Sequence, residues 1–268
     1  MNPLTELFKK KTSNLLSVYI TAGFPEKDST AGIIRSLQEK GVDFIEAGFP
    51  FSDPLADGPV IQMTSQQAIR NGMSLELLLD QLKEARGEIT VPLVLMGYMN
   101  PVLQMGMEVF CRKAHESGAS GVILPDLPVE EYRLLYAPLF KAYNLHMIFL
   151  ITPETSIERI MKIDKLSSGF IYAVSTSSTT GRQNSFSPQQ KAYLKRLRDM
   201  NLKNPIMTGF GIHNSETLKT VCEYTSGAII GTAYLKALMN SRSAKEAADT
   251  LYRQLGLEDS EINSGPER

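Results

Sequence analysis

One pattern of apolar and polar positions repeats along this chain: a short apolar run is followed by a stretch with apolar residues at helical spacing. The runs are almost continuously apolar, which is typical of strands buried on both faces of a parallel sheet. They lie at residues 15–21, 43–48, 92–98, 121–126, 146–151, 170–175, 205–210 and 227–232. Helical spacing is clearest at residues 29–40, 108–117, 130–143 and 156–165.

Eight strand-and-helix units predict an α/β fold, a single (β/α)₈ TIM barrel. No linker rich in proline, glycine or serine divides the chain, so we expect residues 1–268 to form one domain. We expect residues 3–11 to form an extra helix at the N-terminus. We expect residues from about 258 to 268 to form a loose tail.

Two connections are longer than the others: the starts of successive strands lie far apart between residues 43 and 92 and between residues 170 and 205. In a barrel of this kind the active site is built by the loops that follow the strands, and long loops are often functional. We therefore expect the chemistry after the second and sixth strands.

Composition excludes several classes of protein. The 28 basic and 29 acidic residues leave a net charge of −1, which favours neither nucleic acid nor a membrane surface as a partner. The two cysteines, Cys111 and Cys222, have no metal-ligand spacing and form no disulfide framework. No window approaches the ~20 apolar residues of a membrane span, and residues 1–14 do not resemble a signal peptide. We expect a cytoplasmic protein.

Three carboxylates stand at or after the end of the second strand: Glu46, Asp53 and Asp57. Burial of Glu46 in an apolar strand would favour its neutral form and make it a proton donor that can also return as a base. The alternative is that Glu46 faces a helix and pairs with a neighbour, and each aspartate alone could be a turn former. Their grouping at a strand end favours function.

Glycine-containing turns follow the last two strands, at residues 209–212 and 231–238. In these barrels the loops after the seventh and eighth strands and a helix N-terminus commonly bind phosphate through backbone N–H groups. The hydroxyl-rich segment 175–186 could close over a ligand, or it could be a polar loop without a role. Together the two turns favour a phosphorylated small molecule as ligand.

Specific motifs then identify a family. The segment FIEAGFPFSDPLADGPVIQ at residues 44–62 closely resembles the tryptophan synthase alpha subunit family, and further matches extend over nearly the whole length. These are YITAGFP at 19–25, GYMNPVLQMG at 97–106, LPDLPVEE at 124–131, TGFGI at 208–212 and GTA at 231–233.

The resemblance implies retro-aldol cleavage of indole-3-glycerol phosphate to indole and glyceraldehyde 3-phosphate. The family's catalytic glutamate falls on Glu46 and its catalytic aspartate on Asp57. Carbon–carbon cleavage requires protonation of the indole ring at C3, loss of a proton from a glycerol hydroxyl, and stabilisation of a cationic indolenine. The resemblance implies no metal and no organic cofactor in this subunit.

The resemblance also assigns ligand contacts. Tyr172 would help position the acid, while Met96, Tyr98 and Leu150 would line the indole pocket. Tyr19 stands where some relatives have phenylalanine, so we expect an apolar wall there. Thr180 would hold Asp57 when the loop closes, although residues 182–188 follow no pattern that can be matched. The phosphate would be bound by Gly181, Phe210, Gly211, Gly231 and Thr232.

A partner follows from the same resemblance. It implies a pyridoxal-phosphate beta subunit that takes up the indole, in an α₂β₂ tetramer. Residues 51–58 and 100–106 would form the contact, since apolar side chains gather in the second segment.

Two other interpretations of the function remain open from the residues alone. The chain could be an interaction protein that only activates its beta partner, which the intact Glu46, Asp57 and glycine turns argue against. It could instead be another phosphate-binding barrel, such as an isomerase or epimerase. For that reading we would expect a catalytic lysine, cysteine or metal-binding histidine at a strand end, and none is visible.

Overall fold

Nine parallel strands form one continuous sheet in the computed structural model, which describes residues 1–174 and 185–257. Their order is β5-β4-β3-β2-β1-β9-β8-β7-β6. The strands are β1 (Leu15–Thr21), β2 (Phe44–Gly48), β3 (Leu93–Met96), β4 (Ala119–Ile123), β5 (His146–Ile148), β6 (Leu150–Ile151), β7 (Ile171–Val174), β8 (Ile206–Gly209) and β9 (Gly227–Ile230).

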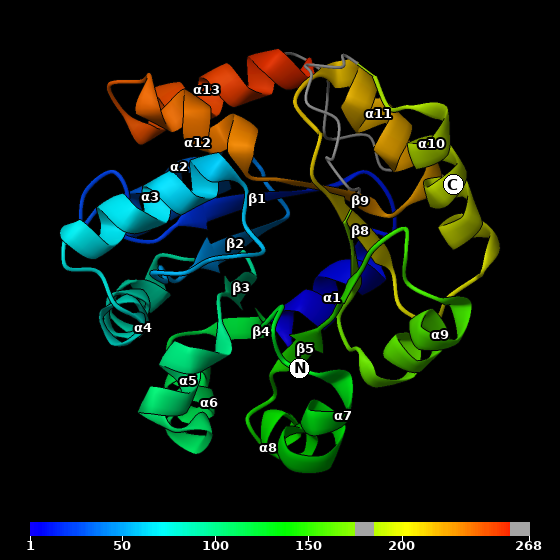
Figure 1. Cartoon of the computed structure of the whole chain (residues 1–268). Helices are drawn as coiled ribbons and strands as arrows, with labels where there is room; N and C mark the ends of the chain where they lie inside the picture. The colour runs from blue at the N-terminus through cyan, green and yellow to red at the C-terminus, as the bar shows by residue number, and fades with distance from the viewer. Residues whose placement is uncertain (175–184, 258–268) are drawn as a thin grey trace.

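The sheet closes into a barrel through an interrupted strand. β5 pairs with β4 and β6 pairs with β7, and the two short strands are separated only by Phe149. The carbonyl of Phe149 accepts a hydrogen bond from the backbone N–H of Tyr172 at 3.0 Å, which joins the two sides. β5 and β6 are therefore one barrel strand, and the predicted (β/α)₈ barrel is confirmed (Figure 1).

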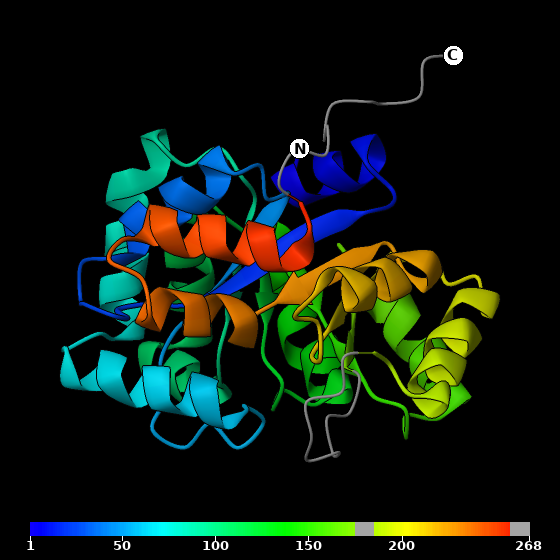
Figure 2. The same ribbon diagram turned by 90° about the horizontal axis from the view of Figure 1, so that it is seen from above.

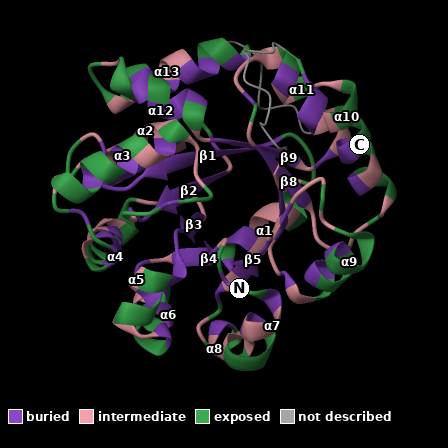
Figure 3. Ribbon diagram, viewed as in Figure 1, coloured by how far each residue is buried: buried purple, intermediate pink, exposed green. Residues whose placement is uncertain are grey.

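Helices surround the barrel and bury one face each against it (Figure 3). The helices between residues 30 and 142 are α2 (Thr30–Glu39), α3 (Pro59–Arg70), α4 (Leu75–Glu84), the 3₁₀ turn η1 (Ala85–Gly87), α5 (Met99–Met105), α6 (Met107–Glu116), α7 (Val129–Glu131), the π-helical turn η2 (Tyr132–Tyr136) and α8 (Ala137–Ala142). Those after residue 150 are α9 (Ile157–Leu166), α10 (Pro188–Asp199), α11 (Ser215–Tyr224), α12 (Thr232–Met239) and α13 (Ala244–Leu255).

The predicted N-terminal helix is present as α1 (Pro3–Lys10), and it covers the end of the barrel where the strands begin (Figure 2). Phe8 of α1 packs on Phe44 and Phe170, with ring centroids 6.3 and 5.9 Å away. The side-chain amide of Asn2 donates to the carbonyls of Ser120 and Asn144 at 2.8 and 2.7 Å. The opposite end, where the strands finish, is left to the ligand-binding loops.

The long connection after β2 differs from the expectation of one long loop. Most of its length is two helices, α3 and α4, and residues 49–58 form its longest irregular segment. Similarly, the single helix predicted over residues 130–143 is broken into α7, η2 and α8. Pro138 has no backbone N–H for the bond to the carbonyl four residues earlier, which explains the wider turn before it.

Candidate active site

Glu46 lies in the middle of β2 with its side chain completely buried. Neither of its carboxyl oxygens has a hydrogen-bond partner in the part of the chain that the structure describes. Burial in this apolar setting raises the pKa of Glu46 to about 8. The prediction that Glu46 is buried is thus confirmed, and the alternative that it pairs with a neighbour is wrong for the described part of the chain.

A second buried acidic residue shows what a structural carboxylate looks like in this barrel. Asp164 of α9 is 5% exposed, and its carboxylate accepts hydrogen bonds from the backbone N–H groups of Lys203 and Asn204, each at 2.9 Å. The side-chain amide of Asn204 adds a third bond at 2.9 Å. This buried carboxyl that serves the fold is therefore held by donors, whereas Glu46 has none among the described residues.

Asp57 lies in the segment after β2 and is held by Tyr98, the residue that precedes α5. The hydroxyl of Tyr98 donates to Oδ2 of Asp57 at 3.2 Å and accepts from the backbone N–H of Ala56 at 3.0 Å. The Tyr98 ring stacks on Phe51 with centroids 5.1 Å apart. Burial raises the pKa of Asp57 to about 6, and the hydrogen bond from Tyr98 opposes that rise.

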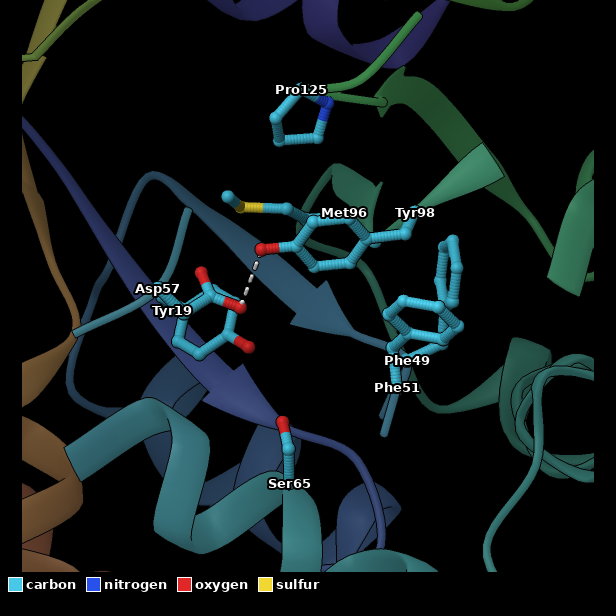
Figure 4. Close-up of a pocket in the computed structure, with 9 residues that line it drawn as sticks. Tyr19, Phe49, Phe51, Asp57, Ser65, Met96, Tyr98 and Pro125 are labelled. Atoms are coloured by element: carbon cyan, nitrogen blue, oxygen red, sulfur yellow. Dashed lines mark hydrogen bonds between the residues drawn. The ribbon is translucent and has the colours of Figure 1, made fainter. Parts of the chain in front are cut away.

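A pocket opens beside this pair, with Tyr98 projecting its hydroxyl toward Asp57 (Figure 4). The residues that line it are Tyr19, Phe49, Phe51, Asp57, Ser65, Met96, Gly97, Tyr98 and Pro125. It therefore unites four of the predicted site residues, Tyr19, Asp57, Met96 and Tyr98. Its lining combines aromatic and apolar side chains with the polar groups of Tyr19, Asp57, Ser65 and Tyr98, so it offers both a surface for a flat ring and an acceptor for an N–H donor.

Two tyrosines bring hydroxyl groups close to the carboxylates. Tyr19 on β1 is in register with Glu46, and Tyr172 on β7 pairs with Leu150 on β6. Burial, Glu46 and Asp57 all raise the pKa of both tyrosines, so both hydroxyls keep their protons. The hydroxyls thus lie within electrostatic reach of both carboxylates, and the wall at Tyr19 is not apolar as the resemblance suggested.

Each of these hydroxyls lies over a glycine of the next strand. A Cβ atom added to Gly48 would lie 2.1 Å from the Tyr19 hydroxyl oxygen, and one added to Gly209 would lie 2.1 Å from that of Tyr172. Real Cβ atoms do not approach so closely, so only glycine leaves room at these two positions. The two glycines at the strand ends therefore fix where the tyrosine hydroxyls lie.

The predicted phosphate-binding turns lie side by side, because β8 and β9 are neighbours. Phe210 and Gly211 follow β8 with positive φ angles of 73° and 77°. Gly231 follows β9 as the N-cap of α12, and Thr232 is the exposed first residue of that helix. A helix start leaves backbone N–H groups without helical partners, and Gly231 has no side chain to cap them.

The remaining predicted residues have varied outcomes. Leu150 is half-buried on β6 and does not line the pocket. Thr180 and Gly181 lie outside the described residues. The pocket adds five residues that the sequence did not single out as site residues: Phe49, Phe51, Ser65, Gly97 and Pro125. Over residues 1–174 and 185–257, no three His, Cys, Asp or Glu side chains gather where they could hold a metal ion, and no helix is long and apolar enough to cross a membrane.

The fold and the site together define a class: a (β/α)₈-barrel enzyme with a buried acid of raised pKa and a second carboxylate of lower pKa, both within electrostatic reach of the same two tyrosines. The family described as "Tryptophan synthase alpha chain" matches residues 5–261. The chain belongs to this family, and it is a carbon–carbon lyase that cleaves indole-3-glycerol phosphate in tryptophan biosynthesis.

Relatives and solved structures agree over most of the chain. The tryptophan synthase alpha chain of Parabacteroides distasonis is 49% identical over 255 residues, which cover 95% of this chain and 99% of the relative. The alpha subunit structure from Legionella pneumophila superposes with a TM-score of 0.84 at 32% identity, covering 96% and 99% of the two chains. A chain of the tryptophan synthase complex from Pyrococcus furiosus gives a TM-score of 0.83 at 31% identity, covering 92% and 99%.

Proposed function

We propose that Glu46 and Asp57 divide the cleavage of indole-3-glycerol phosphate between them. The observation that carries this proposal is the different ionisation of the two carboxyl groups. Burial raises the pKa of Glu46 to about 8 and that of Asp57 only to about 6. Between these values Glu46 holds a proton that it can give, and Asp57 carries a negative charge.

Each role follows from the charge that the reaction develops. Glu46 donates its proton to C3 of the indole ring and becomes a carboxylate. The bond from C3 to the hydroxyl-bearing carbon then breaks as that hydroxyl passes its proton to the Glu46 carboxylate, which restores the neutral acid. Asp57 accepts a hydrogen bond from the indole N–H and stabilises the cationic ring. The absence of any hydrogen bond to Glu46 suits this task, because no donor in the described part of the chain competes for its carboxyl oxygens.

The phosphate of the substrate would be bound at the two turns after β8 and β9. Phe210, Gly211, Gly231 and Thr232 lie there, and the first turn of α12 presents backbone N–H groups and the positive end of the helix dipole. The aromatic pocket beside Asp57 would hold the indole ring. The reaction as proposed uses proton transfer and charge stabilisation alone, so we propose that this subunit needs no cofactor.

We also propose a beta subunit as partner, in an α₂β₂ assembly in the cytoplasm. Support comes from the Pyrococcus furiosus structure, which is that of a tryptophan synthase complex. Exposed apolar residues stand on both segments expected at the contact: Leu55 is 91% exposed and Leu103 is 54% exposed. The pyridoxal phosphate of the pair would belong to the beta subunit.

The experiment is release of indole from indole-3-glycerol phosphate by the purified chain, alone and with a pyridoxal-phosphate beta subunit added. Glu46→Gln should abolish indole formation, because the amide is nearly isosteric but cannot donate the proton. Glu84→Gln, an exposed glutamate on α4, is the matched control and should keep full activity. Activity of Glu46→Gln near that of the control would refute the role of Glu46. A rate that does not change with the beta subunit, together with a sedimentation coefficient unchanged by mixing, would refute the assembly.

A further inference from the structure

Tyr98 contacts Asp57 from a helix position that other residue types usually occupy. It is the N-cap of α5, where serine, threonine, aspartate or asparagine is preferred because its side chain accepts a hydrogen bond from a backbone N–H of the first turn. The side chain of Tyr98 makes no bond of that kind. Its hydroxyl lies instead 3.2 Å from Oδ2 of Asp57 (Figure 4). The first backbone N–H of α5 therefore needs an acceptor from another part of the chain.

Asp126, in the connection after β4, is that acceptor. The backbone N–H of Met99, the first residue of α5, donates to both of its carboxylate oxygens, at 3.0 and 3.1 Å. A turn fixes the place of Asp126, since the backbone N–H of Leu127 donates to the carbonyl of Leu124 at 3.1 Å. Because β3 and β4 are neighbours in the sheet, this turn lies beside the start of α5. Asp126 thus provides the capping contact that Tyr98 does not make.

We propose that Asp126 is a positioning residue, which fixes the backbone at Tyr98 so that the tyrosine hydroxyl stays on Asp57. The inference rests on the role proposed for Asp57 as the negatively charged group of the reaction. The N–H of Met99 belongs to the peptide group that directly follows Tyr98, so a displacement there moves the tyrosine ring with it. Asp126 is exposed and does not line the pocket, and it therefore acts through Tyr98 and not on the ligand.

The ionisation of Asp57 depends on where the Tyr98 hydroxyl lies. Burial raises the pKa of Asp57 and the hydrogen bond from Tyr98 lowers it, so a hydroxyl that moves away raises this pKa further. Loss of the Asp126 charge alone would act in the opposite direction. Burial, Asp57 and Asp126 all raise the pKa of Tyr98, and without Asp126 the hydroxyl would be a stronger donor to Asp57. A change at Asp126 leaves three other titratable groups of the site in place: Glu46, Tyr19 and Tyr172.

The test measures kcat/KM for indole-3-glycerol phosphate as a function of pH with the purified chain. Asp126→Ala should move the acidic limb to higher pH by roughly half a unit, which is less than Tyr98→Phe, where the hydroxyl is absent. Asp126→Asn keeps an oxygen that can accept from Met99, and should move the limb less than half as far as Asp126→Ala. Asp126→Ala combined with Tyr98→Phe should leave the limb where Tyr98→Phe alone places it, because the hydroxyl through which Asp126 acts is gone.

Ser243→Ala is the matched control, because it removes a helix cap that does not touch the site. The side chain of Ser243 accepts from the backbone N–H of Glu246 at 3.2 Å at the start of α13, so its loss should lower stability and leave the acidic limb in place. A limb that stays in place or moves to lower pH in Asp126→Ala would overturn the positioning role. An equal movement in Asp126→Asn, or a further rise in the double variant, would overturn it as well.

A second measurement separates this inference from the proposed function. The carboxyl ¹³C signal of Asp57, identified as the one that Asp57→Asn removes, reports the pKa of Asp57 without substrate or turnover. The same order of shifts is expected there: Tyr98→Phe the largest, then Asp126→Ala, then Asp126→Asn. Retained activity of Glu46→Gln would overturn the proposed function, and it would leave this titration unchanged as a test of Asp126.

Discussion

At the scale of single residues, the site depends on how far burial moves each carboxyl group. Tyr98→Phe removes the hydroxyl that donates to Asp57 and leaves the ring that stacks on Phe51. Because that hydrogen bond holds the pKa of Asp57 down, its loss should move the acidic limb of kcat/KM from near pH 6 to higher pH, by on the order of one unit. The measurement is kcat/KM between pH 5 and 9 for both enzymes.

Phe51→Leu is the control for this prediction. It removes the stacked ring but leaves the hydroxyl of Tyr98 on Asp57, so the acidic limb should stay in place even if kcat/KM falls. An acidic limb that does not move in Tyr98→Phe would show that the hydrogen bond does not control the ionisation of Asp57.

The sequence identified Glu46 and Asp57 through their place at a strand end and through family motifs. It could not identify Phe49, Ser65 and Pro125 as pocket residues, because Phe49 and Ser65 lie far apart in the connection after β2 and Pro125 lies in the connection after β4. Whether their side chains meet depends on the paths of those connections after the strands, which apolar patterning does not determine. The same limit applies to Tyr19, because the sequence does not show that its hydroxyl lies against Gly48.

At the scale of the elements, α1 is held to the barrel by few but well-defined contacts. Asn2→Ala removes the cap on the N–H of Leu4 and leaves the carbonyls of Ser120 and Asn144 without their donor. We expect the free energy of unfolding to fall by about 2–3 kcal/mol, from one lost cap and the unsatisfied buried carbonyl of Ser120. Urea denaturation followed by circular dichroism measures this.

The control for α1 is Lys9→Ala on the exposed face of the same helix, which should change stability by less than about 0.5 kcal/mol. The turnover number of folded Asn2→Ala should equal that of the unchanged chain, since α1 lies at the end of the barrel away from the site. A large loss of turnover without loss of stability would contradict this division between the two ends.

Boundaries of the elements were predictable to within a few residues where apolar spacing was regular, as in α2 and α9. The prediction was wrong for residues 130–143, because periodicity does not show how Pro138 changes the backbone hydrogen bonds before it. It also missed that the long connection after β2 holds two helices, since a short helix at that place was not distinguished from a loop.

At the scale of the whole molecule, the buried Glu46 makes stability depend on pH. The unfolded chain releases this proton near pH 4.5 and the folded chain near pH 8, so between these values the folded state binds more protons. The free energy of unfolding therefore falls as pH rises through this window, by up to about 1.4 kcal/mol per pH unit from this group. Glu46→Gln should lose that slope.

The measurement is urea denaturation of both chains between pH 5 and 8. The stability of Glu46→Gln relative to the unchanged chain should increase steadily with pH, while that of Glu84→Gln should not vary. A difference between Glu46→Gln and the unchanged chain that stays constant over this range would mean that Glu46 is ionised in the folded protein.

The eightfold plan of the molecule was predictable because each strand is buried on both faces and reads as an apolar run. The interruption of the fifth barrel strand at Phe149, and the hydrogen bond from Tyr172 across it, were not visible in that pattern. Local residue patterns determine the units, and long-range pairing determines how the last unit meets the first.

The fit of Tyr19 over Gly48, and of Tyr172 over Gly209, has a consequence for how such a sequence can change over generations. A methyl group at either glycine would displace the ring beside it. The glycine can therefore be replaced by a larger residue only after the tyrosine has been replaced by a smaller one. The glycine and the tyrosine of each pair are therefore constrained to change together, although they lie 29 positions apart in the first pair and 37 in the second.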